Sequence, residues 1–147
     1  MVHDQAYHDA ADDELQLAPP RPHIAPGTYE AVSKRARKGF VFKRTVFILE
    51  FDIFEPGGIQ YGTPPVARGM PCFFRVPPTG RLSPSSKLYR VAQLAGVDLR
   101  QGRLPLRLLI QKAWHVEVTE VTENQAKKPM DKSQHYSIVS DVLDRMA

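Results

Sequence analysis

One segment restricts the fold of this chain more than any other, the run RTVFILEFDIFE at residues 44–55. One face of this run carries Thr45, Phe47, Leu49, Phe51 and Ile53. A two-residue period of this kind is typical of a β-strand with one side packed against a core. The other face begins apolar at Val46 and Ile48 and becomes polar, and EPGG at 55–58 ends the run. The sequence therefore predicts a long strand in a half-exposed sheet.

Four further segments have strand character, and one segment has helical character. The strand-like segments are residues 28–36, 70–76, 113–123 and 135–143. The helical segment is SSKLYRVAQLAG, where Ser85 or Ser86 is a suitable N-cap and Gly96 suits a left-handed stop. Its apolar face would be formed by Leu88, Val91, Ala92 and Ala95. We thus expect a mainly β protein with one helix between the third and fourth strands.

This order is the layout of a five-stranded OB-fold-like barrel. In that fold the face of the second and third strands, together with the loops 1–2 and 4–5, binds oligonucleotides. Loop 1–2 would lie in SKRARKGFVFKR at residues 33–44, which holds six Lys and Arg, two Phe and no acid. Its tip is expected near Lys38-Gly39. Loop 4–5 would be TENQAKKPMDKSQ, which is also basic. Two basic loops at the two binding positions favour a nucleic-acid ligand.

Composition divides the chain into two parts. Residues 1–26 are expected to form an acidic, Pro-rich flexible tail, and residues 27–147 the folded domain. The first 20 residues contain five acids and no Lys or Arg, so the rest carries 20 cations against 11 acids, a net charge of +9. A basic body favours a polyanionic partner. The acidic segment either competes weakly for the basic surface or is an inert extension.

Other features bear on the location of the protein. The N-terminus lacks the basic start and apolar stretch of a signal peptide, and no run reaches the about 18 apolar residues of a membrane helix. A single cysteine, Cys72, fits a reducing compartment. We therefore expect a cytoplasmic protein that does not enter a membrane.

Several segments resemble the OB-fold single-stranded DNA-binding proteins of phages and mobile elements. The likeness lies in PGTYEAV, in RTVFILEFDIFEPGG, in SSKLYRVAQLAGVDL, and in LLIQKAWHVEVTEV followed by YSIVSDVL. Together these span about residues 26–143. The resemblance implies single-strand binding in replication, recombination or transfer of such an element. The acidic segment departs from the pattern, because bacterial single-strand binding proteins usually carry theirs at the C-terminus.

Single-strand binding requires cations for phosphates and aromatic rings for bases. The alternation of a strand points one of Phe73 and Phe74 away from the core without deciding which, and we include Phe74 among the candidate platforms. Phe40 and Phe42 either face the ligand or pack inside. The full candidate set is Lys34, Arg35, Arg37, Lys38, Phe40, Phe42, Lys43, Arg44, Phe74, Arg75, Lys127, Lys128 and Lys132.

Other classes of function have little support in the sequence. There is no phosphate-binding Gly motif, nucleophile elbow or Cys-x-x-Cys pair, and the five His are scattered. We expect no enzyme activity, no cofactor and no metal. The partner is expected to be single-stranded DNA, with RNA as a second candidate, and a homo-oligomer is compatible with the sequence. The alternative is a non-catalytic protein–protein interaction module built on a small β-barrel.

Overall fold

The computed structural model describes residues 21–41, 43–124 and 126–146, and within them the chain is mainly β. The strands are β1 (Gly27–Val41), β2 (Arg44–Phe54), β3 (Ala67–Arg75), β4 (Ala113–Val121) and β5 (Tyr136–Arg145). The α-helices in this part of the chain are α1 (Gly58–Tyr61) and α2 (Lys87–Leu94). Short 3₁₀ turns lie at Leu99–Gln101, Leu106–Leu109 and Lys132–Gln134. The predicted order of strands, with a helix between the third and fourth, is confirmed; α1 is not among the predicted elements.

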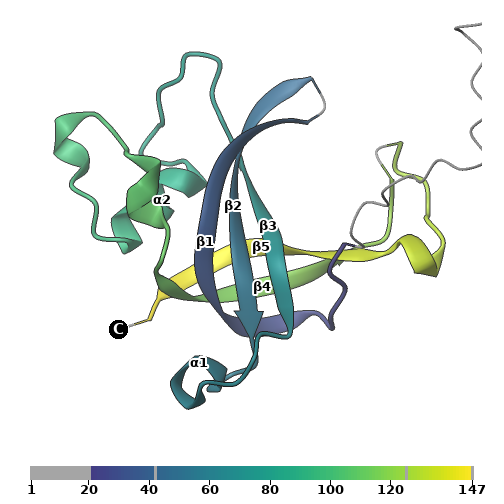
Figure 1. Cartoon of the computed structure of the whole chain (residues 1–147). Coiled ribbons are helices and arrows are strands. Elements are labelled where there is room, and N and C mark those ends of the chain that lie inside the picture. The colour runs from purple at the N-terminus through teal and green to yellow at the C-terminus, as the bar shows by residue number, and fades with distance from the viewer. Residues whose placement is uncertain (1–20, 42, 125, 147) are drawn as a thin grey trace, which may run out of the picture.

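The strands form a single antiparallel sheet in the order β3-β2-β1-β4-β5. β1 pairs with β4 over Gly27–Val32 and with β2 from Glu30 to Val41, so it bends from one neighbour to the other (Figure 1). The two outer strands, β3 and β5, also contact each other. No hydrogen-bonded ladder joins them in the described residues, so the sheet is strongly curved but is not a closed barrel.

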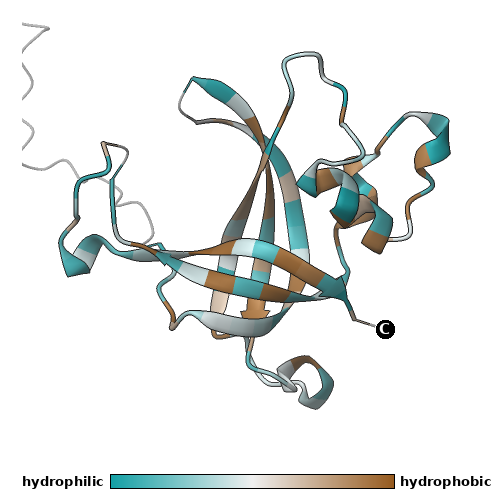
Figure 2. Cartoon of the chain, turned by 180° about the vertical axis from the view of Figure 1, so that it is seen from behind, coloured by the Kyte–Doolittle hydropathy of each residue, from teal (hydrophilic) through white to brown (hydrophobic). Residues whose placement is uncertain are grey.

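The core lies on the inner face of this curved sheet. The alternation predicted for β2 is confirmed, because Phe47, Leu49, Phe51 and Ile53 are all buried. Figure 2 shows the same alternation of hydrophobic and hydrophilic residues along β4 and β5. The other strands and α2 complete the core with Met70, Cys72, Phe74, Leu88, Val91, Ala92, Trp114, Val116, Val118, Val139 and Val142.

The helix α2 begins and ends as its sequence predicts. Ser86 is the N-cap, and its side chain accepts a hydrogen bond from the amide of Tyr89 at 3.2 Å. Gly96 follows the helix with φ of 79°, a left-handed conformation that glycine adopts at little cost. On its exposed side Arg90 donates to the carbonyls of Val142 at 2.9 Å and Leu143 at 2.8 Å. These bonds fix α2 against the end of β5.

A β-bulge in β1 decides which way the basic residues point. The ladder with β2 pairs Ser33 with Phe51 and then Arg35 with Glu50, so Lys34 is an extra residue. An extra residue reverses the alternation of the strand. Ser33 therefore points into the core and Ala36 does so again, whereas Arg35 and Arg37 point outward. Without the bulge, the residues at 35 and 37 would share the inner face of Ser33.

Hydrogen bonds from buried Ser33 hold the bulge in place. Its Oγ donates to the carbonyl of Leu109 at 2.7 Å and accepts from the Trp114 indole Nε1 at 3.1 Å. It also accepts from the amide of Lys112 at 3.2 Å. Ser33 thus joins β1 to the segment that leads into β4.

The tip of the β1–β2 hairpin differs from the prediction. The ladder continues past Lys38 and Gly39 to the pair Val41 and Arg44, so the hairpin ends beyond this pair and not at Lys38-Gly39. Gly39 has another role here. A Cβ atom on Gly39 would lie 2.8 Å from Cδ1 of Ile48, so only glycine fits beside that side chain without a shift. Most of the predicted loop 1–2 is therefore paired strand.

The chain before β1 runs beside β5. Residues 1–20 of the predicted tail lie outside the described residues, whereas Arg21 to Pro26 are described. The amide of Ser137 donates to the carbonyl of Pro22 at 2.8 Å, and the amide of Ile24 donates to Ser137 Oγ at 2.9 Å. The Arg21 guanidinium lies 4.2 Å from the centre of the Tyr136 ring. These contacts attach residues 21–24 to the start of β5.

Candidate nucleic-acid interface

The outer face of β1, β2 and β3 brings predicted cations together with an aromatic ring. The register places Arg37, Ile48 and Phe73 side by side across the three strands. Arg75 lies two residues from Phe73 on β3, beside Val46, and Arg35 lies two residues from Arg37 on β1. We call these six residues, Arg35, Arg37, Val46, Ile48, Phe73 and Arg75, the outer patch. Its apolar centre is flanked by cations.

The aromatic ring of the outer patch is Phe73 and not the predicted Phe74. Phe73 is 40% exposed, whereas Phe74 is 1% exposed and packs with a ring-centre distance of 5.9 Å against Phe47. Phe74 therefore has no free face for a base, and its inclusion as a platform is wrong. Ile48 next to Phe73 is only 3% exposed, so the ring of Phe73 rests on a filled apolar surface.

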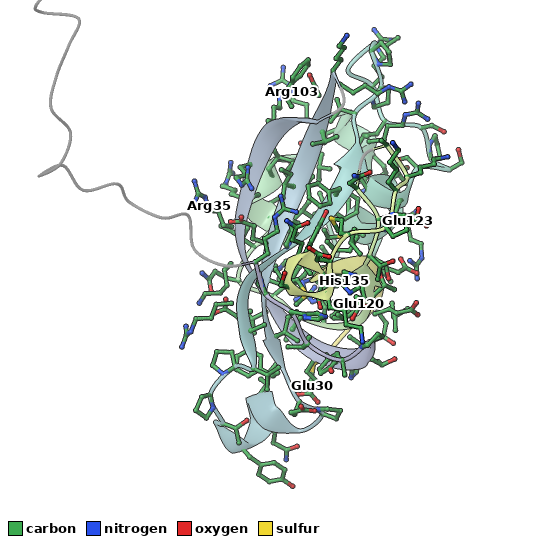
Figure 3. The ribbon with its side chains drawn as sticks, turned by 90° about the vertical axis from the view of Figure 1, so that its right-hand side faces the viewer. Glu30, Arg35, Arg103, Glu120, Glu123 and His135 are labelled. Carbon is green, nitrogen blue, oxygen red and sulfur yellow. The ribbon has the colours of Figure 1, made fainter. Side chains whose placement is uncertain are left out.

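The charge of the outer patch is positive but not uniform. Arg37 Nε lies 3.3 Å from Oε2 of Glu50, so this pair partly neutralises itself. Arg35, Arg44 and Arg75 are exposed and form no ion pair with any other described residue. Arg35 points away from the sheet into solvent in Figure 3. Lys34 in the bulge and Lys43 in the turn are also exposed. Free guanidinium groups of this kind suit phosphate oxygens.

Two predicted residues lie on the other side of the same hairpin. Lys38 pairs with Phe47, and Phe40 pairs with Thr45, so both side chains lie on the inner face of β1. Phe40 is 71% exposed because the hairpin extends beyond the core. Lys38 lines a groove under the hairpin and not the outer patch. Phe42 lies outside the described residues. The single predicted basic loop is thus divided between two faces.

The predicted loop between β4 and β5 is a separate basic element. Lys127, Lys128 and Lys132 are all exposed there. Asn124 organises the loop, since its side-chain Oδ1 accepts from the amides of Ala126 at 2.9 Å and Lys128 at 3.0 Å. Figures 1 and 2 show this loop standing apart from the end of the β1–β2 hairpin.

A cluster of two histidines and a glutamate fixes the chain before β1. His23 Nε2 lies 2.7 Å from Oε2 of Glu120, and His135 Nδ1 lies 3.4 Å from Oε1 of the same carboxylate. Figure 3 shows Glu120 beside His135. The hydrogen bond with His23, and less so the charges of His23 and His135, lower the pKa of Glu120 below its usual range. The carboxylate thus holds residue 23 against β4.

Groups with catalytic potential are few among the residues described. No cluster of three or more His, Cys, Asp or Glu in residues 21–41, 43–124 and 126–146 could hold a metal ion. Burial raises the pKa of the Cys72 thiol to about 12, so it is not a nucleophile at neutral pH. In the same part of the chain, no helix has the length and apolarity needed to cross a membrane.

Comparison with known proteins adds no family assignment. No protein-family model matches the sequence, and no curated protein matches it. The function must therefore be argued from the geometry of the outer patch and its surroundings. The strongest single feature is the exposed ring of Phe73, which lies in a row with Arg37. Arg35 and Arg75 in the same patch form no ion pair with a described residue.

Proposed function

We propose that this protein binds single-stranded nucleic acid, in the first place DNA, on the outer patch of β1, β2 and β3. The observation that carries the proposal is the exposed ring of Phe73, which lies in a row with Arg37 and two residues from Arg75 on β3, while Arg35 lies two residues from Arg37 on β1. A base stacks on the ring while the guanidinium groups contact the phosphates on either side. This combination matches the alternating chemistry of a single strand.

The architecture supports an OB-fold as part of the same proposal. The strand order β3-β2-β1-β4-β5, the bend of β1 between two partners and the position of α2 between β3 and β4 are all those of this fold. The contact of β3 with β5 lies where a ladder would close the barrel. A role in replication, recombination or transfer of a phage or mobile element rests on the resemblance of the sequence alone.

The composition of the outer patch favours binding that tolerates any sequence. Direct readout of bases uses side-chain amides, carboxylates or bidentate arginines aimed at base edges. The outer patch offers an aromatic face, aliphatic side chains and arginines, and the acid beside it, Glu50, is engaged by Arg37. A ring that needs an unstacked base also discriminates against duplex DNA, because bases within a duplex have no free face.

Fluorescence anisotropy with labelled oligonucleotides tests the proposal. We expect an oligo-dT strand to bind more tightly than a duplex of equal length, with similar affinities for strands of different sequence. Affinity should fall with salt along a line of slope about −0.7 per phosphate contact. A parallel titration with an oligo-U strand distinguishes DNA from RNA as the preferred ligand. Tighter binding of the duplex, or affinity that does not change with salt, would contradict the proposal.

A further inference from the structure

A groove of about 780 Å³ opens on the inner side of the β1–β2 hairpin, on the face opposite the outer patch. One wall is the hairpin, and the other is formed by the segment after β3, by α2 and by the turns that follow it. Figure 1 shows α2 and the segments around it on one side of the β1–β2 hairpin, and Figure 3 labels Arg103. The groove is lined by Lys38, Phe47, Val76, Gly80, Arg81, Leu82, Leu88, Tyr89, Leu99, Gly102, Arg103, Leu104 and Leu106.

The lining of the groove combines an aliphatic surface with a cationic rim. Most of the side chains are Leu, Val or aromatic, whereas the charged ones are Lys38, Arg81 and Arg103, and none is an acid. The nearby Asp98 is engaged by Arg100, whose Nε lies 3.1 Å from Oδ1. An occupant that complements this surface carries leucine-like side chains together with carboxylates.

The same lining disfavours a nucleobase. A base that enters an aliphatic groove buries its polar edges without hydrogen-bond partners, which is unfavourable. Besides the cations, the phenol of Tyr89 is the one polar side chain among the lining residues. Leucine side chains bury no such groups. The groove therefore suits a peptide segment better than a nucleotide.

A segment of this composition occurs in the chain itself. Residues 12–17 read DDELQL, with three acids followed by two leucines, and no Lys or Arg occurs in residues 1–20. The segment lies outside the described residues, and the described chain begins at Arg21 on the ring of Tyr136.

The position of Arg21, where the described chain begins, limits which groove residues 12–17 can enter: that of the same molecule or that of a second copy. Three residues, Ala18, Pro19 and Pro20, separate Leu17 from Arg21, and the four Cα-to-Cα steps span at most about 14 Å. Tyr136 lies at the start of β5, whereas α2 contacts this strand farther along, at Ser140 through Lys87 and at Val142 through Arg90. Figures 1 and 2 show the first described residues and α2 on opposite sides of the molecule. A segment that starts on the Tyr136 side of the molecule therefore reaches the groove of a second copy more readily than its own.

We propose that residues 12–17 of one copy dock in the groove of a second copy, with Leu15 and Leu17 on the aliphatic lining and the acids on Arg81 and Arg103. Each copy then offers one segment and one groove, so two copies that exchange segments close as a dimer, and copies that do not exchange extend head-to-tail into a row. The contact uses the face opposite the outer patch, so it leaves the proposed nucleic-acid surface free. It does not depend on that function and is testable without nucleic acid.

Sedimentation velocity of the full-length protein at low salt, without nucleic acid, tests the contact. We expect the native chain to form dimers and longer species as concentration rises. A segment variant, Leu15→Ser with Leu17→Ser, and a groove variant, Arg81→Glu with Arg103→Glu, should each remain monomeric. Their equimolar mixture should form a dimer that grows no further, because the segment variant keeps its groove and the groove variant keeps its segment. Circular dichroism verifies that each variant is folded.

Two matched controls complete the experiment. Lys127→Glu with Lys128→Glu makes the same change of charge at exposed positions that do not line the groove, and it should associate like the native chain. Asp12→Lys with Asp13→Lys should abolish association, and combining it with the groove variant should restore at least a tenth of the native association constant. A native chain that stays monomeric, or a groove variant that associates like the native chain, would overturn the proposal. So would a mixture that contains monomers alone.

Discussion

Phe73 lies opposite Ile48 in the ladder between β2 and β3, so its ring stands on the outer face while the next residue, Phe74, packs in the core. Ile48 is buried although it belongs to the outer face, and it supports the ring from the side. A ring supported in this way loses little conformational entropy when a base stacks on it. This relationship makes Phe73 the residue on which the proposed function depends most.

Replacing Phe73 separates stacking from folding. Phe73→Ala should reduce the affinity for oligo-dT by about 5- to 150-fold, the equivalent of one lost base stack of about 1–3 kcal/mol. It should leave the melting temperature nearly unchanged, because the ring is partly exposed. Phe74→Ala should instead lower the free energy of unfolding by about 3–5 kcal/mol. Tyr61→Ala, a change at an exposed ring on α1, serves as the control and should alter neither quantity. Unchanged affinity of the Phe73 variant would exclude the ring as a platform.

The cations of the outer patch should determine the salt dependence of binding. Replacing Arg35 and Arg75 by Ala removes two proposed phosphate contacts and should flatten the slope of log affinity against log salt by about 1.4. Lys38→Ala with Arg103→Ala removes the same charge from the groove side of the hairpin and should leave that slope almost as it was. If both pairs changed the slope equally, overall charge and not the outer patch would control binding.

The pattern of residues alone could predict the strands, but it could not predict which residues of β1 face the core. Strict alternation from Ser33 would place Arg35 and Arg37 in the core, and a strand that ends at residue 36 avoids this conflict for Arg37 alone. The chain solves it with a bulge at Lys34, which is fixed by hydrogen bonds from Ser33 to Leu109 and Lys112. These partners are more than 70 residues away in the sequence, so no local pattern contains them.

The choice between Phe73 and Phe74, in contrast, was contained in the sequence. Met70, Cys72 and Phe74 share one face of the strand and are all apolar, whereas Phe73 shares its face with Arg75. The arginine marks the exposed side. The predicted position of the hairpin tip differs for another reason. Gly39 stands in a sequence typical of a turn, but it is a glycine because Ile48 packs closely against it.

The β4–β5 loop should contribute only to the binding of longer strands. Lys127, Lys128 and Lys132 are exposed but stand apart from the hairpin end. Replacing all three by Ala should weaken the binding of a long oligo-dT and leave that of a strand of a few nucleotides unchanged. Anisotropy titrations with a series of strand lengths measure this. An equal loss at every length would place the loop beside Phe73 in the complex.

Ser33 should contribute more to the free energy of unfolding than its small side chain indicates. Ser33→Ala leaves the Leu109 carbonyl, the Lys112 amide and the Trp114 indole N–H without their partner, and the expected loss in unfolding free energy is about 1–3 kcal/mol. Trp114→Phe removes the indole donor, so the double variant should lose less than the two single variants combined. Urea denaturation of the four proteins provides the comparison. Strictly additive losses would show that the bond between Ser33 and Trp114 has no net value.

Glu120 should make the attachment of the chain before β1 sensitive to acid. Its pKa is lowered from 4.5, mainly by the hydrogen bond with His23, so the unfolded chain binds this proton more readily than the folded one. The resulting stabilisation is complete above the unfolded pKa and is lost as the pH falls through the folded pKa.

The melting temperatures of the native protein and Glu120→Gln should therefore differ above about pH 5.5 and converge as the pH falls below 4.5. The protection of the Ile24 amide, which donates to Ser137 Oγ, should decrease over the same range when its exchange rate is divided by the intrinsic rate at each pH. Glu123→Gln is the control, because this exposed neighbour forms no ion pair with any described residue, and its melting curve should follow the native one at every pH. A native melting temperature that stays parallel to that of Glu120→Gln down to pH 3 would mean that the carboxylate does not hold His23 in solution.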